Sequence, residues 1–248
     1  LVAQDSTYYG KDIYGEPSLA RLLQELVKIE KIEWLRVLYC YPKNFTDELI
    51  TTIAQEPKIC KYVDLPLQHA HNSILKSMRR PDTQEEVVTL LEKIRARIPN
   101  VAVRSTFIVG FPGETDAQYQ TLRRFLIEQR FEKVGIFTYS QEEGTPAASM
   151  PRQVPEDVVQ ERYHDLMSVQ CKISEELNQG LEGKELDVLV EGRDEEQTNL
   201  AFGRSYREAP GVDGQIFIEG DAASRQGDIV RVRIVQGFTY DAVGELVE

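Results

Sequence analysis

The stretch Phe107-Ile-Val-Gly-Phe-Pro-Gly-Glu-Thr115 decides the fold prediction. Its first three residues are aromatic or β-branched, so they favour a buried strand. The Gly-Pro-Gly turn that follows ends this strand and lets the backbone come close to a ligand. Thr115 and Gln118 have the spacing of a capping box, which predicts a helix start. A strand that ends in such a turn at a helix N-terminus is a ligand-binding device in parallel α/β proteins.

The first 180 residues alternate expected strands and helices in the same way. Apolar runs predict the strands, and apolar stripes at helical spacing predict the helices. The expected strands are 1–4, 34–41, 62–67, 101–109 and 133–139, and the expected helices are 17–29, 46–54, 83–98, 115–129 and 156–178. Such alternation predicts a parallel sheet covered by helices, curved by right-handed crossovers into an open sheet or a barrel.

The pattern changes after Gly180. Val230, Val232 and Ile234 alternate with two arginines, which is the period-two pattern of a half-buried strand. Five short strands are expected at 185–191, 198–205, 214–219, 229–235 and 240–247. This number of short strands predicts a small antiparallel β-barrel of OB-like size. We therefore expect an α/β domain over 1–180 and a β-barrel domain over 181–248, with the boundary at 179–182.

The composition indicates an ordinary soluble globular protein. Hydrophobic residues make up 41% of the 248 residues and charged residues 28%. No apolar run is long enough to span a membrane, and no signal peptide is present, so we expect a cytoplasmic location. The chain opens on Leu1-Val-Ala without an initiator Met, in what reads as a strand, which suggests a piece of a longer protein.

The cysteines and the charge limit the possible sites and partners. Cys40, Cys60 and Cys171 are far apart and form no CxxC pattern, so reduced thiols are expected, with no self-contained metal site. The net charge is −12; residues 181–248 hold 15 acids and seven bases, a net of −8. Such an acidic module is a poor candidate for binding phosphate and a better one for a basic partner, although the charge could serve solubility alone.

Four motifs, in order along the chain, resemble those of the radical-SAM methylthiotransferases. They are Asp64-Leu-Pro-Leu-Gln-His69, Met78-Arg-Arg-Pro81, Ile108-Val-Gly-Phe-Pro-Gly-Glu-Thr115 and Tyr139-Ser-Gln-Glu-Glu-Gly-Thr-Pro-Ala147. The terminal barrel resembles the TRAM domain that ends these enzymes. The first motif is similar to the RimO branch, which modifies an aspartate of a small-subunit ribosomal protein. The tRNA-modifying, MiaB-like branch usually has His-Leu-Pro-x-Gln-Ser-Gly-Ser at this place.

The resemblance implies a fold and a set of cofactors. The fold would be a partial (β/α)6 radical-SAM barrel without its first strand, followed by the TRAM barrel. The cofactors would be S-adenosylmethionine and two [4Fe–4S] clusters, all of whose ligands lie outside this chain, because the CxxxCxxC motif of the family is absent. This chain alone would then be inactive, hold no metal and contain no identifiable catalytic residue.

The resemblance also implies a set of S-adenosylmethionine contacts. They are Gln4, Asp5, Gln68, Arg104, Gly110, Gly113, Glu114 and Tyr139. The turn at 110–114 would approach the adenosyl group, Gln4 and Asp5 the methionyl amine, and Arg104 the carboxylate. Gln68 could hydrogen-bond the nucleoside or the substrate. The others have ordinary alternatives: a tight turn, a polar strand end for Gln4 and Asp5, a structural ion pair for Arg104 and core packing for Tyr139.

Three functions are therefore open. The preferred one is a methylthiotransferase for the β carbon of an aspartate in a ribosomal protein, with the acidic TRAM domain meeting this basic partner, an external electron donor, and no membrane or nucleic acid as partner. The alternative is a MiaB-like tRNA methylthiotransferase, which a basic face of Arg204, Arg207, Arg231 and Arg233 would favour. The non-enzyme alternative is a binding module built on a degenerate radical-SAM barrel.

Overall fold

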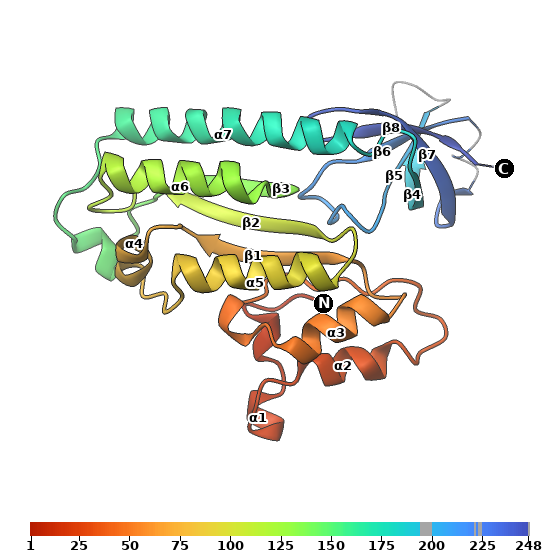
Figure 1. The fold of residues 1–248 in the computed structure, drawn as a ribbon, viewed down its shortest axis with the longest axis horizontal. Helices are drawn as coiled ribbons and strands as arrows, with labels where there is room; N and C mark the ends of the chain where they lie inside the picture. Colours follow the sequence, from red (N-terminus) through yellow and green to blue (C-terminus); the bar gives the residue numbers. More distant parts are fainter. Residues whose placement is uncertain (194–199, 221, 223–224, 248) are drawn as a thin grey trace. The chain divides into compact units, whose positions relative to one another are not determined.

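The computed structural model describes residues 1–193, 200–220, 222 and 225–247 (Figure 1). Two compact units are distinguished by their contacts, Leu1–Gln170 and Cys171–Glu248. The change between them falls within helix α7 (Glu156–Gln179). The expected boundary at 179–182 begins at the last residue of this helix, whereas the second unit begins at Cys171, so the last residues of α7 belong to the second unit.

The first unit contains a three-stranded parallel sheet in the order β1-β2-β3. Its strands are β1 (Tyr62–Gln68), β2 (Ala102–Val109) and β3 (Lys133–Thr138). Both pairings are parallel, with Asp64 opposite Arg104 and Phe107 opposite Ile136. The expected strand–turn–helix at 107–115 and its two neighbouring strands are thus confirmed.

Two expected strands of this sheet were wrong. Neither segment is a strand: residues 34–41 form the isolated bridge between Leu35 and Ile59, and Leu1 exchanges backbone hydrogen bonds with Arg36 and Leu38. Tyr39 adopts a left-handed conformation with φ of 57°, which turns the chain and interrupts any continuous ladder. The apolar character of 34–41 is satisfied instead by burial, since Leu35, Val37 and Cys40 belong to the core.

The long helices agree with the sequence pattern. They are α2 (Leu19–Leu26), α3 (Asp47–Gln55), α5 (Gln84–Arg97), α6 (Asp116–Gln129) and α7. Capping boxes form at Thr83 and at Thr115, as their spacing predicts. The short elements were not predicted; they are η1 (Ser6–Tyr8), α1 (Lys11–Tyr14), η2 (Pro42–Asn44), α4 (Asn72–Ser77) and η3 (Pro146–Ser149).

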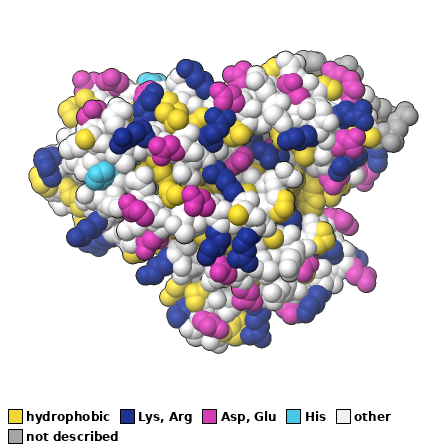
Figure 2. Space-filling model, in the orientation of Figure 1, with side chains coloured by type: hydrophobic (Ala, Val, Ile, Leu, Met, Phe, Trp, Pro, Cys, Tyr) yellow, Lys and Arg dark blue, Asp and Glu magenta, His cyan; other side chains and the backbone are white. Residues whose placement is uncertain are grey.

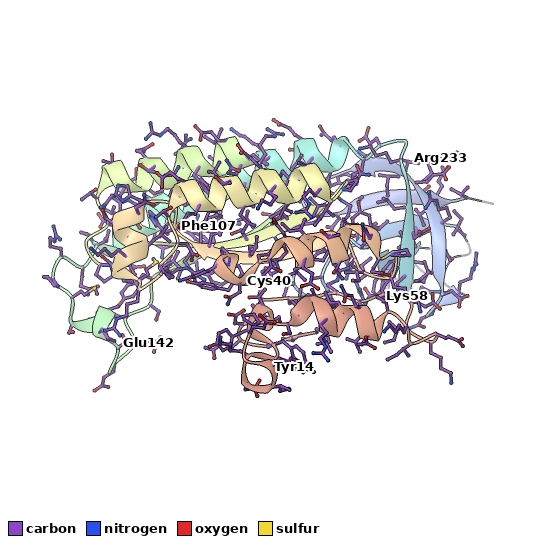
Figure 3. All side chains as sticks on the ribbon, turned by 60° about the horizontal axis from the view of Figure 1, so that its bottom comes forward. Tyr14, Cys40, Lys58, Phe107, Glu142 and Arg233 are labelled. Carbon is purple, nitrogen blue, oxygen red and sulfur yellow. The ribbon has the colours of Figure 1, made fainter. Side chains whose placement is uncertain are left out.

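The two faces of the parallel sheet have different roles. Phe107 points to one face, where it is fully buried and meets Phe125 of α6 edge-on at a ring distance of 6.2 Å. Figure 3 shows Phe107 deep among the helices, whereas Tyr14 and Glu142 lie at the periphery. Because side chains alternate along a strand, Arg104 and Thr106 of β2 point to the opposite face. That opposite face carries the cavity described below.

The second unit contains a closed five-stranded barrel in the order β4-β5-β6-β8-β7. Its strands are β4 (Glu185–Arg193), β5 (Leu200–Arg204), β6 (Ile216–Glu219), β7 (Ile229–Gly237) and β8 (Ala242–Leu246). All five match expected strands, although residues 198–199 of the second lie outside the described residues. Valines and isoleucines such as Val188, Ile218 and Val232 fill the interior.

The expectation of a wholly antiparallel barrel needs one correction, because β6 and β8 pair in parallel. An odd number of strands cannot alternate in direction around a closed ring, so one neighbouring pair must run the same way. The other four pairings are antiparallel. Within the described part of the chain, no helix has the length and apolar character that a membrane span requires.

Candidate functional site

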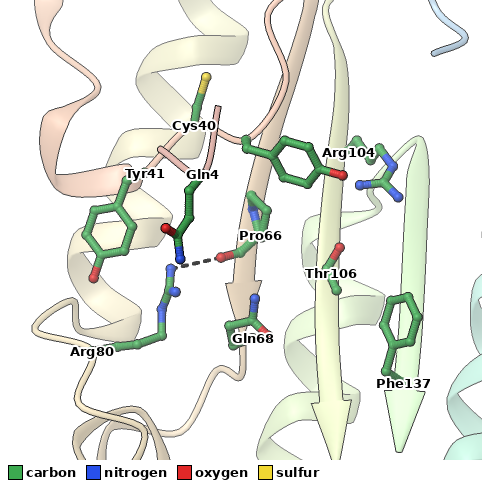
Figure 4. A pocket seen from close by; sticks show the side chains of 10 residues that line it. Gln4, Cys40, Tyr41, Pro66, Gln68, Arg80, Arg104, Thr106 and Phe137 are labelled. Atoms are coloured by element: carbon green, nitrogen blue, oxygen red, sulfur yellow. Dashed lines mark hydrogen bonds between the residues drawn. The ribbon is translucent and has the colours of Figure 1, made fainter. Parts of the chain in front are cut away.

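A cavity of about 310 Å³ lies on the face of the sheet opposite Phe107 (Figure 4). Its walls come from the N-terminal segment, the extended segment before η2, all three strands and the residues after α4. The lining residues are Gln4, Tyr39, Cys40, Tyr41, Pro66, Gln68, Arg80, Arg104, Thr106 and Phe137. This mixture of aromatic walls with a few polar groups is typical of a small-molecule site.

The strands bring polar groups to the cavity through small distortions. Gln68 ends β1 in a left-handed conformation with φ of 71°, and the register of β1 against β2 shifts between Leu65 and Gln68. Such irregularities re-aim a side chain at the end of a strand and cluster at functional sites. Tyr39, across the cavity, is also left-handed. Two strained, non-glycine residues thus face one cavity.

A buried ion pair supports the cavity wall. The Asp64 carboxylate, whose side chain is 1% exposed, lies 3.1 Å from Nη1 of Arg104. Its second oxygen accepts a hydrogen bond of 2.9 Å from the Tyr39 backbone N–H. The Asp64 charge is therefore compensated in place, and the Arg104 guanidinium is held at the wall with 14% of its side chain exposed.

Tyr41 and Arg80 form the rim on the other side. The Arg80 guanidinium stacks on the Tyr41 ring at 4.7 Å, and its Nη2 donates to the Pro66 carbonyl at 2.8 Å, as Figure 4 shows. Burial raises the pKa of Tyr41 to about 12, with Arg80 opposing this shift and Asp82 adding to it. Tyr41 therefore remains a neutral phenol at physiological pH.

The turn at 110–114 lies outside the lining of this cavity and is held by Glu114. The Glu114 carboxylate is fully buried; it accepts from the Gly110 N–H at 3.0 Å and from Nη1 of Arg162 at 2.8 Å. His69 Nε2 lies 3.6 Å from the same carboxylate. Glu114 thus fixes the turn to α7.

Both glycines of this turn adopt a positive φ, which favours glycine over other residues. Gly110 has φ of 78°, and a Cβ atom there would lie 2.5 Å from Cγ2 of Val159. Gly113 has φ of 84°, and its N–H donates to the Arg152 carbonyl at 2.8 Å. The close approach at Gly110 is therefore made by helix α7.

Asp5 and Tyr139 also lie outside the lining of the cavity. Asp5 caps η1, where Oδ1 accepts from the Thr7 N–H at 3.0 Å and Oδ2 accepts from Asn44 at 3.4 Å. The Tyr139 ring meets Phe111 edge-on at 5.5 Å, and its buried hydroxyl has no hydrogen-bond partner among the described residues. The first residue closes a turn, and the second packs beside the turn at 110–114.

The cavity thus contains three of the eight residues expected there: Gln4, Gln68 and Arg104. Sequence reasoning missed Thr106 as a site residue, although it lies two positions after Arg104 on the same strand and so shares its face. Phe137 follows from the pairing of β3 with β2, where it lies opposite Ile108. No local sequence pattern predicts Tyr39 as a site residue, because its backbone N–H is held by the Asp64 carboxylate, which is distant in the sequence.

The cavity fits S-adenosylmethionine in chemical character but offers nothing for a cluster. Its polar groups suit an amino acid and a nucleoside, and its aromatic walls suit a base. Among the described residues, no group of histidines, cysteines and acids could hold a metal ion. Cys40 is buried, and burial raises its pKa far above the ordinary range, with Asp64 and Asp5 adding to the shift, so no thiolate forms there.

Comparison with known proteins agrees with this geometry. The Radical SAM superfamily model matches residues 11–126, and the TRAM domain model matches residues 183–247. The family of these domains implies S-adenosylmethionine and a [4Fe–4S] cluster as cofactors. Coproporphyrinogen III oxidase (HemN) of Escherichia coli, a radical SAM enzyme, shares the fold with a TM-score of 0.50 at 15% identity, over 61% of this chain and 37% of that one.

Two curated relatives match the chain throughout. Ribosomal protein uS12 methylthiotransferase RimO of Desulforamulus reducens is 47% identical over 100% of this chain and 56% of the relative. The protein of the same name from Geobacter sulfurreducens is 49% identical, over 100% of this chain and 55% of the relative. The chain therefore spans just over half the length of these relatives. By these matches the chain combines a radical-SAM domain with a TRAM domain and is similar throughout to the RimO methylthiotransferases.

Proposed function

We propose that this chain is part of a cytoplasmic methylthiotransferase that modifies the β carbon of an aspartate in ribosomal protein uS12. The observation that carries the proposal is the motif at 64–69, which distinguishes the RimO branch and here builds the cavity wall. Its Asp64 holds Arg104 at 3.1 Å, and its Gln68 lines the cavity. The relatives named for uS12 match the chain from end to end, which supports the same substrate.

In this proposal the cavity binds S-adenosylmethionine, which supplies the radical and methyl chemistry of the family. Gln4 and Gln68 would hydrogen-bond its polar groups, and Arg104 would face its carboxylate while Asp64 keeps the guanidinium in place. Tyr39 and Phe137 would cover the bound molecule and exclude water. The two [4Fe–4S] clusters of the proposal, with all their ligands outside this chain, and the electron donor complete the reaction.

The residues at 110–114 have a supporting role in this proposal. Glu114 ties the Gly110 N–H to Arg162, so the turn has one fixed conformation. Gly113 and Tyr139 lie in or beside this turn and Asp5 caps η1, and none of the three lines the cavity of about 310 Å³. We propose that they shape the surroundings of the site, and that any direct contact from them requires a ligand extending beyond this cavity.

The charges of the barrel support a protein substrate over tRNA. Arg231 pairs with Asp187 at 2.9 Å and with Glu185 at 3.3 Å, and Arg233 pairs with Glu185 at 3.0 Å. The two other arginines of the expected basic face are Arg204, which pairs with Glu191, and Arg207, which is buried. Figure 2 likewise shows acidic and basic side chains interleaved on the drawn face. Binding of a phosphate backbone needs uncompensated positive charge.

Anaerobic reconstitution tests the proposal. The full-length protein would be loaded with iron and sulfide and incubated with S-adenosylmethionine, a reductant and uS12, and the uS12 peptides would be analysed by mass spectrometry. We expect one methylthio group on one aspartate. Modification of tRNA in place of uS12 would support the MiaB-like alternative, and binding of uS12 without any modification would support the binding module.

A matched pair of variants links the activity to the cavity. Gln68→Ala removes a polar group of the lining, so we expect a KM for S-adenosylmethionine raised by roughly tenfold, the effect of one charge-assisted or well-placed hydrogen bond. Gln120→Ala changes the same residue type on the exposed surface of α6, so it should leave the KM unchanged. If both substitutions changed the KM equally, S-adenosylmethionine would have to bind outside this cavity.

A further inference from the structure

A second cavity, of about 300 Å³, lies beside the first. Pro42 and Lys43 of η2 form one side, Pro81 and Asp82 form another, and α5 supplies Glu86, Val87 and Leu90. The chain passes from the first cavity to the second at two places, between Tyr41 and Pro42 and between Arg80 and Pro81. Tyr41 and Arg80, which stack on each other and line the first cavity, thus directly precede residues that line the second.

The second cavity contains a buried carboxylate without a compensating cation. Asp82 is 9% exposed, and its Oδ2 atom has no hydrogen-bond partner among the described residues. No ion pair to Asp82 is formed within the described ranges, in contrast to Asp64 and Glu114, which each meet an arginine. A buried carboxylate without a cation is costly to maintain, so such groups usually meet a charged partner.

The other walls suit the aliphatic part of a long cationic side chain. Pro42, Pro81, Val87 and Leu90 present apolar surface along the cavity. Glu86 adds a second carboxylate, held in place by the capping box, where it accepts from the Thr83 N–H at 2.9 Å. Lysine and arginine cover such surface with their methylene groups while the head reaches an acid.

We propose that this cavity binds a lysine or arginine side chain of the protein substrate, with its methylene groups on the proline and leucine walls and its cationic head at Asp82. A small rotation of the carboxylate about its Cβ–Cγ bond presents Oδ2 to the ligand. The partner fits because ribosomal proteins carry many lysines and arginines to bind RNA phosphates. This inference rests on the proposed function, since it takes the substrate to be a basic protein.

The position of the cavity gives it a role in substrate recognition. A substrate segment that places one basic side chain against Asp82 is held next to Tyr41 and Arg80, which line the first cavity. Arg80 also repels a second cation from the wall, which leaves Asp82 as the favoured position for positive charge. We therefore infer that the second cavity sets the register of the substrate.

Nuclear magnetic resonance titration of the isotope-labelled 248-residue chain tests this inference. The probes are Nα-acetyl-arginine methylamide and its uncharged analogue Nα-acetyl-citrulline methylamide. We expect the arginine probe to shift the amide signals of Lys43, Asp82 and Val87 and to bind roughly tenfold more tightly than the citrulline probe. Equal affinity of the two probes, or shifts confined to other residues, would overturn the inference without any variant.

Asp82→Asn should weaken the affinity for the arginine probe by roughly tenfold and leave the affinity for the citrulline probe unchanged. Asp12→Asn removes an exposed carboxylate of α1 and should change neither. Asp82→Asn should also raise the urea midpoint, because it removes an uncompensated buried charge; a lowered midpoint would mean that the carboxylate is satisfied within the folded chain. Neither measurement uses S-adenosylmethionine, a cluster or uS12, so this inference can fail while the proposed function stands.

Discussion

Asp64 and Arg104 lie opposite each other on β1 and β2, and their side chains form a buried ion pair of 3.1 Å. Asp64 begins the motif that resembles the RimO branch, and Arg104 interrupts an otherwise apolar strand. The pair joins these two sequence features at the wall of one cavity. A polar residue within a buried strand is thus explained by a partner on the neighbouring strand.

Asp64→Asn should destabilise the chain strongly. The substitution removes the negative charge from a buried pair and leaves the Arg104 guanidinium without this carboxylate, which costs about 3 kcal/mol in comparable cases. Urea unfolding followed by circular dichroism measures the change. Asp47→Asn is the matched control, because Asp47 pairs with Lys93 and Arg97 at the surface, where solvent screens the charges. A similar loss in both variants would mean that burial of the pair has no consequence.

Gly110→Ala should destabilise the turn in two ways. The residue has φ of 78°, and an added Cβ would lie 2.5 Å from Val159, so strain and overpacking together should cost roughly 2–5 kcal/mol. Gly144→Ala is the control, because its φ is 81° but no atom lies within 4 Å of the added Cβ; it should cost about 1 kcal/mol.

A second substitution separates the two effects at Gly110. Val159→Ala removes the methyl groups that the added Cβ would meet, so the double variant should lose less stability than the sum of the two single losses. The measurement is a double-mutant cycle of urea unfolding. Additive losses in the cycle would exclude the contact between Gly110 and Val159 as the cause.

Asp165 should make the stability of the first unit depend on pH in the acidic range. Burial alone would raise the pKa of this carboxyl, but hydrogen bonds from Arg123 and Tyr119 outweigh burial and hold the pKa below its ordinary value of 3.8. The folded state then binds the proton more weakly than the unfolded state. The stability from this pair is therefore complete above about pH 4 and is lost as the pH falls through the folded pKa.

Asp165→Asn isolates this contribution. We expect it to lower the urea midpoint by a constant amount between pH 7 and pH 5, and the difference from the unmodified chain to narrow below pH 4. The effect should not exceed about 1 kcal/mol, because Asp165 is 39% exposed and solvent screens the pair. A difference that narrows already above pH 5 would mean that the folded pKa is raised.

Much of the fold could be predicted because it depends on residues that are close in the sequence. The capping boxes at Thr83 and Thr115 form as expected, since each needs only residues three positions apart. The barrel strands follow from period-two alternation. The expected strand at 34–41 failed because membership of a sheet requires a continuous ladder with a neighbour, and the left-handed Tyr39 interrupts it.

In the candidate site, too, some features follow from local sequence and others only from tertiary packing. By itself the sequence determined the strand–turn–helix at 107–115, the two-part architecture and the polar strand end at Gln68. Only the tertiary structure decided that Arg104 faces Asp64, that Glu114 faces Arg162, and that Asp82 lies in a second cavity. The reason is physical: local pattern sets which face a side chain takes, whereas its partner depends on how distant segments pack together.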